Sequence, residues 1–237
     1  MGCAAELTQQ KTGITREEQD EYAFNSHQKA LKAQADGKFD QEIFPVEIPQ
    51  RKGDPAVFNK DECPRQGISV EKLARLKPAF EKGGTVTAGN APGLNDGSSC
   101  TVVVSESYMK KKGLKPLATV IDYTVAGTPP ELLFFSPIYA VQKLMKKMNV
   151  DINHFDLIEA NEAFSIQCLA DGKELGWDWD RVNVHGGAVA LGHPIGASGA
   201  RCLTTLIYAL KDRGLKNGLC TLCLGGGNAV AMSIEMV

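Results

Sequence analysis

The sequence predicts an α/β protein, with a layered α/β domain over residues 116–237 and a helical, loop-rich lobe over residues 1–84. From Pro116 onward, β-rich runs alternate with amphipathic helical patterns, which is the order of elements in a layered α/β domain. The last two β-rich runs flank the turn Gly225-Gly226-Gly227 and could form an antiparallel edge hairpin. We therefore expect a mixed sheet that is otherwise mainly parallel.

The first lobe begins with a clear helix signal. Thr15 and Glu18 have the spacing of a capping box, and Gly37 is placed to close a helix of about twenty residues. The remainder of the lobe is polar and contains repeated Pro and Gly. This composition is typical of helices and loops laid over another domain.

Four helix signals and six apolar runs follow the lobe. Ser136-Pro137 is the pattern of an N-cap and first helical residue, and Ser198 is placed to cap a helix that Gly214 ends. The apolar face of the first of these helices is expected to contain Ile138, Val141, Leu144, Met145 and Met148. Strands are predicted at residues 100–104, 117–125, 155–160, 182–184, 219–224 and 229–236.

Composition limits the class of function. The chain has 237 residues, 43% apolar content and a net charge of -2, so no global positive field favours nucleic acid or anionic lipid. The lysines at 110–112 are interpreted as a solvated helix end, and no run is long enough for a membrane span. The seven cysteines form an odd, scattered set typical of reduced thiols. We expect a cytoplasmic protein, with a mitochondrial or peroxisomal location as an alternative.

Three polar residues lie beside glycines or at predicted strand ends: Asn161, His193 and Cys223. A thiol, an imidazole and an amide can handle a reactive acyl group without a metal or redox cofactor. Each residue alone has an ordinary structural interpretation, as a strand-end cap, a turn histidine and a core cysteine. The other histidines, His27, His154 and His185, are interpreted as structural.

Other chemistries fit the same residues less well. Cys220 and Cys223 have Cys-x-x-Cys spacing, but residues three apart on a strand face opposite sides of the sheet, which argues against zinc or redox chemistry. Gly225-Gly226-Gly227 is followed by a β-rich run, whereas a dinucleotide fingerprint needs a helix. The glycines between Gly187 and Gly192 lack the Lys-Ser/Thr of a phosphate loop.

Together, four segments resemble the signature segments of thiolases in order and spacing. They are residues 85–97, Asn161-Glu162-Ala163-Phe164, residues 186–201 and residues 223–227. The resemblance implies a coenzyme A-dependent acyltransferase that condenses two acetyl-CoA to acetoacetyl-CoA, or performs the reverse thiolysis, through an acyl-cysteine. Coenzyme A would be a substrate, and no cofactor is implied.

The resemblance also implies roles for individual residues. Cys223 would be the acid/base, which requires a partly ionised thiol with a cationic or hydrogen-bonding partner. His193 would donate to a thioester oxygen, Asn161 would anchor a water beside it, and the backbone N–H of Gly225 would serve a second oxyanion hole.

Substrate contacts are implied at four further positions: Arg65, Phe80, Ala88 and Phe164. Arg65 would meet the CoA nucleotide, although a solvated loop arginine explains it equally well. Pro92 stands where thiolases usually have a serine that contacts the pantetheine arm, so that contact is in doubt. Residues 132–139 are bulkier than the usual glycine-containing stretch, which favours short acyl chains.

Thiolases carry a nucleophilic cysteine in an N-terminal domain, and none of the seven cysteines lies in a segment that resembles its motif. Residues 85–115 are interpreted as a strand and helix remaining from that domain. We therefore hypothesise a fragment that is inactive alone, in a homo-oligomer, dimer or tetramer, or paired with a nucleophile-bearing chain. The alternatives are a broader-chain 3-ketoacyl-CoA thiolase and a non-catalytic CoA-binding or assembly half.

Overall fold

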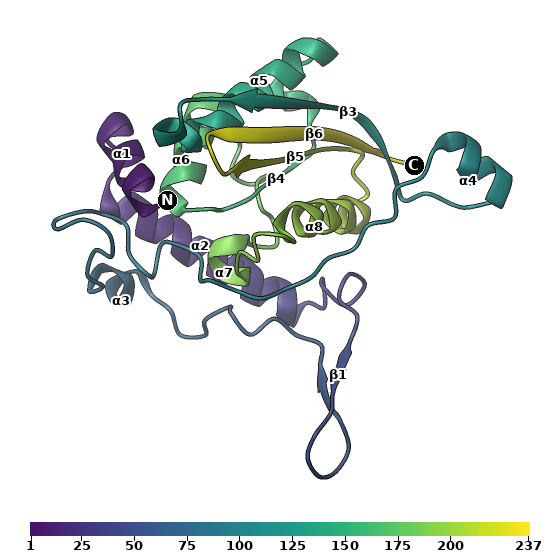
Figure 1. Cartoon of the computed structure of the whole chain (residues 1–237), viewed down its shortest axis with the longest axis horizontal. Helices are drawn as coiled ribbons and strands as arrows, with labels where there is room; N and C mark the ends of the chain where they lie inside the picture. The colour runs from purple at the N-terminus through teal and green to yellow at the C-terminus, as the bar shows by residue number, and fades with distance from the viewer.

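The computed structural model describes all 237 residues. Two helices, a small hairpin and two short helices come first, and a four-stranded sheet with its covering helices follows (Figure 1). In chain order the elements are α1 (Gly2–Thr12), α2 (Arg16–Ala35), β1 (Val46–Ile48), β2 (Ala56–Phe58), α3 (Val70–Ala74), α4 (Glu106–Lys112), β3 (Ala118–Gly127), η1 (Pro130–Phe135), α5 (Ser136–Met148), η2 (Ile152–His154), β4 (Leu157–Ala160), α6 (Ser165–Leu175), α7 (Ala188–Leu191), α8 (Ser198–Arg213), β5 (Asn217–Leu224) and β6 (Asn228–Met236).

The main sheet has the strand order β3-β6-β5-β4 and is mixed, as predicted. β4 pairs with β5 in parallel, whereas β6 is antiparallel to both β5 and β3. The predicted hairpin of the last two strands forms, but not at an edge, because β3 pairs along the free side of β6. Parallel pairing is therefore the minority, and the predicted strand at residues 182–184 contributes a single parallel bridge between Ile158 and Val182.

Helices cover the two faces of this sheet. α5 packs on one face, where Ile138, Val141 and Leu144 join a buried cluster with side chains of β5 and β6. α8 packs on the opposite face, and its Leu206 and Leu210 share a second cluster with Leu157 of β4 and Cys220 of β5. Figure 1 shows α5 above the sheet and α8 below it. The predicted apolar face of α5 is thus confirmed at its buried positions.

The outward side chains of β3 stay exposed. Ile121, Tyr123 and Val125 are 45%, 59% and 48% exposed. These three residues alternate along β3, so their side chains lie on one side of the strand.

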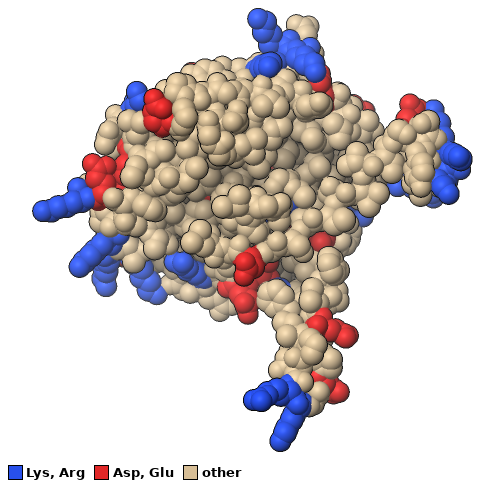
Figure 2. Space-filling view, in the orientation of Figure 1, with Lys and Arg blue, Asp and Glu red and all other residues tan.

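The N-terminal lobe follows its local sequence signals. The capping box of α2 is present, with the Thr15 side chain accepting from the Glu18 backbone N–H and the Glu18 side chain accepting in return. The β1–β2 hairpin projects from the body (Figure 1), and every residue of both strands is exposed. Figure 2 shows Lys and Arg gathered at the tip of this hairpin and on α4, with a largely uncharged face between them.

Three local predictions were wrong in detail. The segment at residues 100–104 forms no strand, and Val102 and Val103 are 85% and 75% exposed, because no neighbouring strand pairs with it. Ser136 is the first residue of α5 and not its cap, since η1 leads directly into the helix. Ser198 is the first residue of α8, after Ala197, and its side chain makes no capping bond.

Candidate active site

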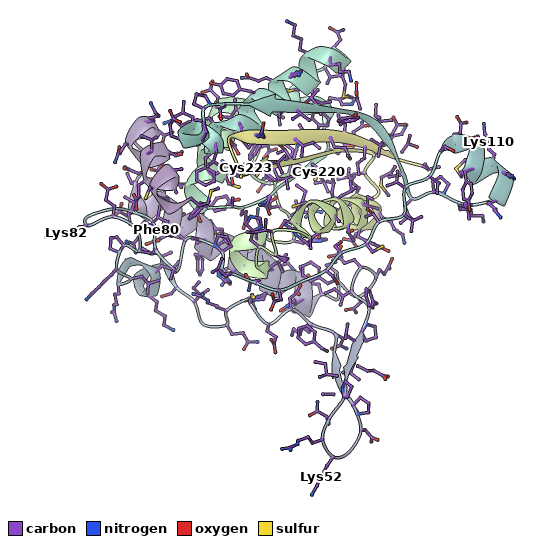
Figure 3. The ribbon with its side chains drawn as sticks, in the orientation of Figure 1. Lys52, Phe80, Lys82, Lys110, Cys220 and Cys223 are labelled. Carbon is purple, nitrogen blue, oxygen red and sulfur yellow. The ribbon has the colours of Figure 1, made fainter.

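Asn161 and Cys223 lie at the same edge of the sheet because β4 and β5 run in parallel. Ala160, the last residue of β4, pairs with Thr221, and the Asn161 N–H donates to the Thr221 carbonyl at 3.0 Å. Cys223 is two residues further along β5. Figure 3 shows it toward the turn of the β5–β6 hairpin. The carboxyl ends of parallel strands are where α/β proteins collect functional groups.

Cys220 and Cys223 face opposite sides of the sheet, as predicted. Cys220 is 5% exposed and belongs to the cluster under α8. Cys223 packs instead against the cluster that contains Phe134 and Phe164. The two thiols therefore cannot act as a pair, and Cys223 is the one on the side of the aromatic residues.

His193 is held from three directions. Its Nδ1 lies 2.6 Å from the Ser198 Oγ, its backbone N–H donates to the Asn95 Oδ1 at 3.2 Å, and its Nε2 lies 3.4 Å from the Asn161 Nδ2. Three segments far apart in the sequence, around Asn95, Asn161 and residues 193–198, thus meet at one histidine. The Ser198 side chain, predicted to be a helix cap, contacts this imidazole instead.

The pKa of His193 is lowered from its ordinary value, first by burial and second by the positive charge of Arg201. Burial disfavours the charged imidazolium, and a nearby guanidinium opposes a second positive charge. The ring is therefore neutral at physiological pH. A neutral imidazole can donate one hydrogen bond without carrying charge.

Burial raises the pKa of the Cys223 thiol to about 12, and the nearby Asp171 carboxyl adds to the rise. No cationic group offsets these effects. The expectation of a partly ionised thiol was therefore wrong, because the side chain packs among apolar residues that cannot stabilise a thiolate. The resting form of Cys223 is the neutral thiol.

Glu162, which sequence reasoning left without a role, ties the motif segments together. Its fully buried carboxylate accepts from Tyr22 (3.0 Å) and Ser26 (2.8 Å) of α2, from the Asn183 side chain (3.0 Å) and from the Val189 backbone N–H (2.9 Å). A buried carboxylate needs this number of donors to remain stable. Its position next to Asn161 in the motif was the one sequence feature that could have indicated a role for Glu162.

Arg201 and Asn95, to which the sequence analysis assigned no role, contact residues next to the site. Arg201 pairs with Glu159 of β4 at 2.6 Å, two residues before Asn161. Asn95, whose Oδ1 accepts from His193, donates from its Nδ2 to the Cys63 sulfur at 3.2 Å. The loop at residues 85–97 thus reaches the histidine through Asn95.

The glycine turn after β5 serves two purposes. Gly227 has φ +91°, and a Cβ there would lie 2.3 Å from the Thr128 carbonyl oxygen, so this glycine is required for the close approach of the loop after β3. Gly225 is exposed, and a Cβ there would meet nothing within 4 Å. The backbone at Gly225 is thus open to solvent, and its role as a donor to substrate stays a prediction.

The four predicted substrate residues fall into two groups. Phe164 contacts Phe80 and Phe134 edge-to-face, with ring centroids 6.2 and 5.2 Å apart, in the cluster against which Cys223 packs. Arg65 and Ala88 are exposed, and neither forms a hydrogen bond or ion pair with Cys223, His193 or Asn161. The backbone N–H of Arg65 donates to the His27 Nδ1 at 3.1 Å.

Neither Cys223 nor His193 lines the cleft beside α2. This cleft, of about 550 Å³, runs between α2 and the segment after α6, and Tyr22, Glu162 and Trp179 line part of it. No group of three or more His, Cys, Asp or Glu side chains could hold a metal ion. No helix is both long and apolar enough to cross a membrane.

Two family models match the chain. The model of the thiolase C-terminal domain matches residues 114–236, and that of the thiolase N-terminal domain matches residues 1–107. An acetyl-CoA acetyltransferase of Allochromatium vinosum is 52% identical over 99% of this chain, and one of Cupriavidus necator is 51% identical. The chain spans 60% of the length of these curated relatives.

Two solved structures of similar proteins superpose on this chain. The acetyl-CoA acetyltransferase of Bacillus anthracis superposes with a TM-score of 0.97 at 51% identity, over all of this chain and 60% of its own. The human mitochondrial 3-ketoacyl-CoA thiolase superposes with a TM-score of 0.92 at 37% identity. This chain thus has the fold of the part of those two proteins that it covers, 60% of each.

Proposed function

Since this chain belongs to the thiolase family, we propose that it carries the proton-transfer and oxyanion-binding residues of an acetyl-CoA acetyltransferase. The similar chains of Allochromatium vinosum and Bacillus anthracis bear that name. The proposed substrates are acetyl-CoA, acetoacetyl-CoA and coenzyme A. The bacterial origin of the first of these chains favours a cytoplasmic location.

One observation carries the proposal: the Nε2 of His193 and the Nδ2 of Asn161 lie 3.4 Å apart at the strand edge that also holds Cys223. Removing a proton from the α-carbon of a thioester leaves negative charge on the thioester oxygen. The His193 imidazole, and a water anchored by Asn161, would stabilise that oxygen, and one such donor is worth about 10²- to 10³-fold in rate.

The proton goes to Cys223 in the condensation direction. The α C–H bond breaks, an S–H bond forms at Cys223, and the electron pair moves onto the thioester oxygen beside His193. A thiol pKa of about 12 makes the thiolate scarce but a strong base when it forms. In the reverse direction the neutral thiol returns the proton to the enolate carbon.

Transfer through an acyl-cysteine needs a second reactive thiol. Cys168, Cys202 and Cys220 are buried, and Cys3 and Cys100 are exposed. Cys63 is partly buried and accepts from the Asn95 side chain, and burial raises the pKa of its thiol. We therefore propose that full exchange requires a nucleophile-bearing partner, either another polypeptide or another thiolase subunit. The chain alone would perform only the proton-transfer step.

That step gives the test. In D₂O, the purified chain should exchange the methyl protons of acetyl-CoA for deuterium, followed by ¹H NMR. Cys223→Ser should abolish the exchange and His193→Ala should slow it by about 10²- to 10³-fold, whereas Cys100→Ser, at an exposed thiol, should leave it unchanged. Proton–deuterium exchange by Cys223→Ser at the rate of the unchanged chain would remove the basis of the proposal. Acetoacetyl-CoA thiolysis by the lone chain would contradict the need for a partner.

The aromatic cluster favours the acetyl group. Phe134 is 1% exposed and fills the space beside Phe164, against which Cys223 packs. Hexanoyl-CoA should therefore exchange its α-protons much more slowly than acetyl-CoA. Equal rates would favour the second candidate, a 3-ketoacyl-CoA thiolase of broader chain length, for which the human mitochondrial structure is the relevant likeness.

A further inference from the structure

The backbone of His193 has little support from its own turn. Its N–H and C=O form no hydrogen bond with other backbone groups. Gly192 before it has φ +100°, which glycine adopts easily, and Pro194 after it has no N–H. The His193 N–H donates instead to the Asn95 Oδ1 at 3.2 Å, and it has no other acceptor. A side chain 98 positions earlier therefore holds this backbone.

Two glycines give the loop that carries Asn95 room to reach the histidine turn. A Cβ at Gly192 would lie 2.8 Å from the Asn95 Cγ, and one at Gly97 would lie 2.9 Å from the Pro194 Cγ. Contacts this short leave no space for a side chain at either glycine. The loop thus packs directly on the turn, and the hydrogen bond to the histidine is part of a close fit.

Only one orientation of the Asn95 amide supports His193. A backbone N–H can only donate, so it must face the amide oxygen, and the Asn95 Nδ2 then points the other way. There the Cys63 sulfur accepts from it at 3.2 Å. Burial, followed by the negative charges of Asp61 and Glu62, raises the pKa of the Cys63 thiol, whereas the hydrogen bond from Asn95 acts against that rise.

We propose that Asn95 is a positioning residue whose Oδ1 fixes the backbone of His193, and that the Cys63 sulfur keeps the Asn95 amide turned so that it can do so. Ser198 contacts the ring at Nδ1, 2.6 Å away, so the imidazole is held at the ring and at the backbone. The inference rests on the proposed role of His193. A misplacement of about 1 Å can cost about 10²-fold in rate, so Asn95 contributes to rate without touching the substrate.

Hydrogen–deuterium exchange of backbone N–H groups, followed by ¹H–¹⁵N NMR of the full chain, tests the contact directly. The His193 N–H should exchange at least about tenfold more slowly than in an unstructured peptide. Asn95→Leu removes the acceptor and should abolish this protection, whereas Asn95→Asp keeps an acceptor oxygen and should retain it. An unprotected His193 N–H in the unchanged chain would overturn the inference, whether or not any variant folds.

Acetyl-CoA proton exchange tests the positioning role. At pH 8.5, well above the ordinary His pKa of about 6.5, Asn95→Leu should lower kcat by about tenfold to 10²-fold and leave KM nearly unchanged. Asn95→Asp should keep most of the rate. Asn153→Leu, at an exposed asparagine of η2, is the matched control and should exchange like the unchanged chain. A folded Asn95→Leu variant with the full rate would refute the role of Asn95.

The contact with Cys63 has its own measurement. Asn95→Asp replaces the donor beside the sulfur with a negative charge, so it should raise the Cys63 pKa further. Alkylation of Cys63 by iodoacetamide at pH 8.5, followed by peptide mass spectrometry, should then slow by about tenfold, the effect of one pKa unit. The exposed Cys100 is the internal control and should react at an unchanged rate. Equal rates at Cys63 in the two chains would contradict the orientation of the amide.

These measurements separate the inference from the proposed function. If the unchanged chain shows no proton exchange, the proposed function fails, while loss of His193 N–H protection in Asn95→Leu still supports the positioning contact. If the unchanged chain and Asn95→Leu exchange protons equally fast, the proposed function stands and the role of Asn95 fails.

Discussion

Cys223 combines an apolar environment with the proposed role in proton transfer, and its pKa of about 12 makes that combination testable. Below this pKa the thiolate fraction rises about tenfold for each pH unit. The rate of acetyl-CoA proton exchange should therefore increase steadily from pH 6 to pH 9. Above pH 7 His193 should add no inflection, because burial lowers its pKa from the ordinary value of 6.5.

The exchange rate should be measured at constant ionic strength with the uncatalysed rate subtracted, since hydroxide also removes α-protons. A plateau between pH 7 and pH 8 would show that the Cys223 thiol is far more acidic than its surroundings indicate. The sequence located this thiol through its glycine-rich motif. It could not reveal the apolar packing that governs the pKa, because the residues that supply it lie from about 50 to more than 200 positions away in the chain.

At the scale of elements, Gly186 fixes how α2 sits against the motif segments. Its φ is +77°, and a Cβ there would lie 2.6 Å from the Ser26 carbonyl oxygen and 2.8 Å from the Ala30 backbone nitrogen. Gly186→Ala should lower the free energy of unfolding by about 2–4 kcal/mol, from left-handed strain and the clash with α2. Urea unfolding followed by circular dichroism measures the difference.

Gly113 is the matched control for that substitution. It ends α4 with φ +63°, and a Cβ there would meet nothing within 4 Å. Gly113→Ala should therefore cost only the left-handed strain, about 1 kcal/mol. Equal losses at the two glycines would mean that α2 moves away freely and that its packing against Gly186 has little value.

Helices were predictable where local chemistry defines them, as at the capping box of Thr15 and Glu18 and at Gly214, which ends α8 with φ +64°. Strand order was not, because pairing depends on distant residues: β3 joins β6 across about a hundred positions. The contacts of Ser198 were not predicted for the same reason. Its place beside a helix start favoured a cap, but His193 and Pro194 compete for its hydroxyl.

At the scale of the whole molecule, a buried group of charges joins the first lobe to the sheet. Glu42 accepts from Thr205 of α8 at 3.3 Å, and Arg201 of the same helix pairs with Glu159 of β4. Burial, and then the charge of Glu159, raises the pKa of Glu42 to about 8. Burial raises the pKa of Glu159 to about 7, although Arg201 opposes the shift. The folded state thus holds protons that the unfolded chain releases.

This difference fixes the sign of the pH dependence. A carboxyl whose pKa is higher in the folded state stabilises the fold below its unfolded value, 4.5, and loses that contribution as pH rises through the folded value. Between pH 5 and pH 8.5 the wild-type chain should therefore lose stability. Glu42→Gln keeps the shape and removes the titration, so its stability should change less over the same range.

The wild type and Glu42→Gln should have similar free energies of unfolding at pH 5. At pH 8.5 Glu42→Gln should be the more stable by about 1–2 kcal/mol, which is less than the pKa shift alone would give because Glu42 is only partly shielded from solvent. Chemical unfolding of both chains across the pH series measures the difference. Glu47→Gln, at an exposed site on β1, controls for loss of net charge and should follow the wild type. A wild-type stability that stays flat from pH 5 to pH 8.5 would show that Glu42 ionises freely in the folded chain. The first lobe would then be joined to the sheet by an ordinary charged network and not by a retained proton.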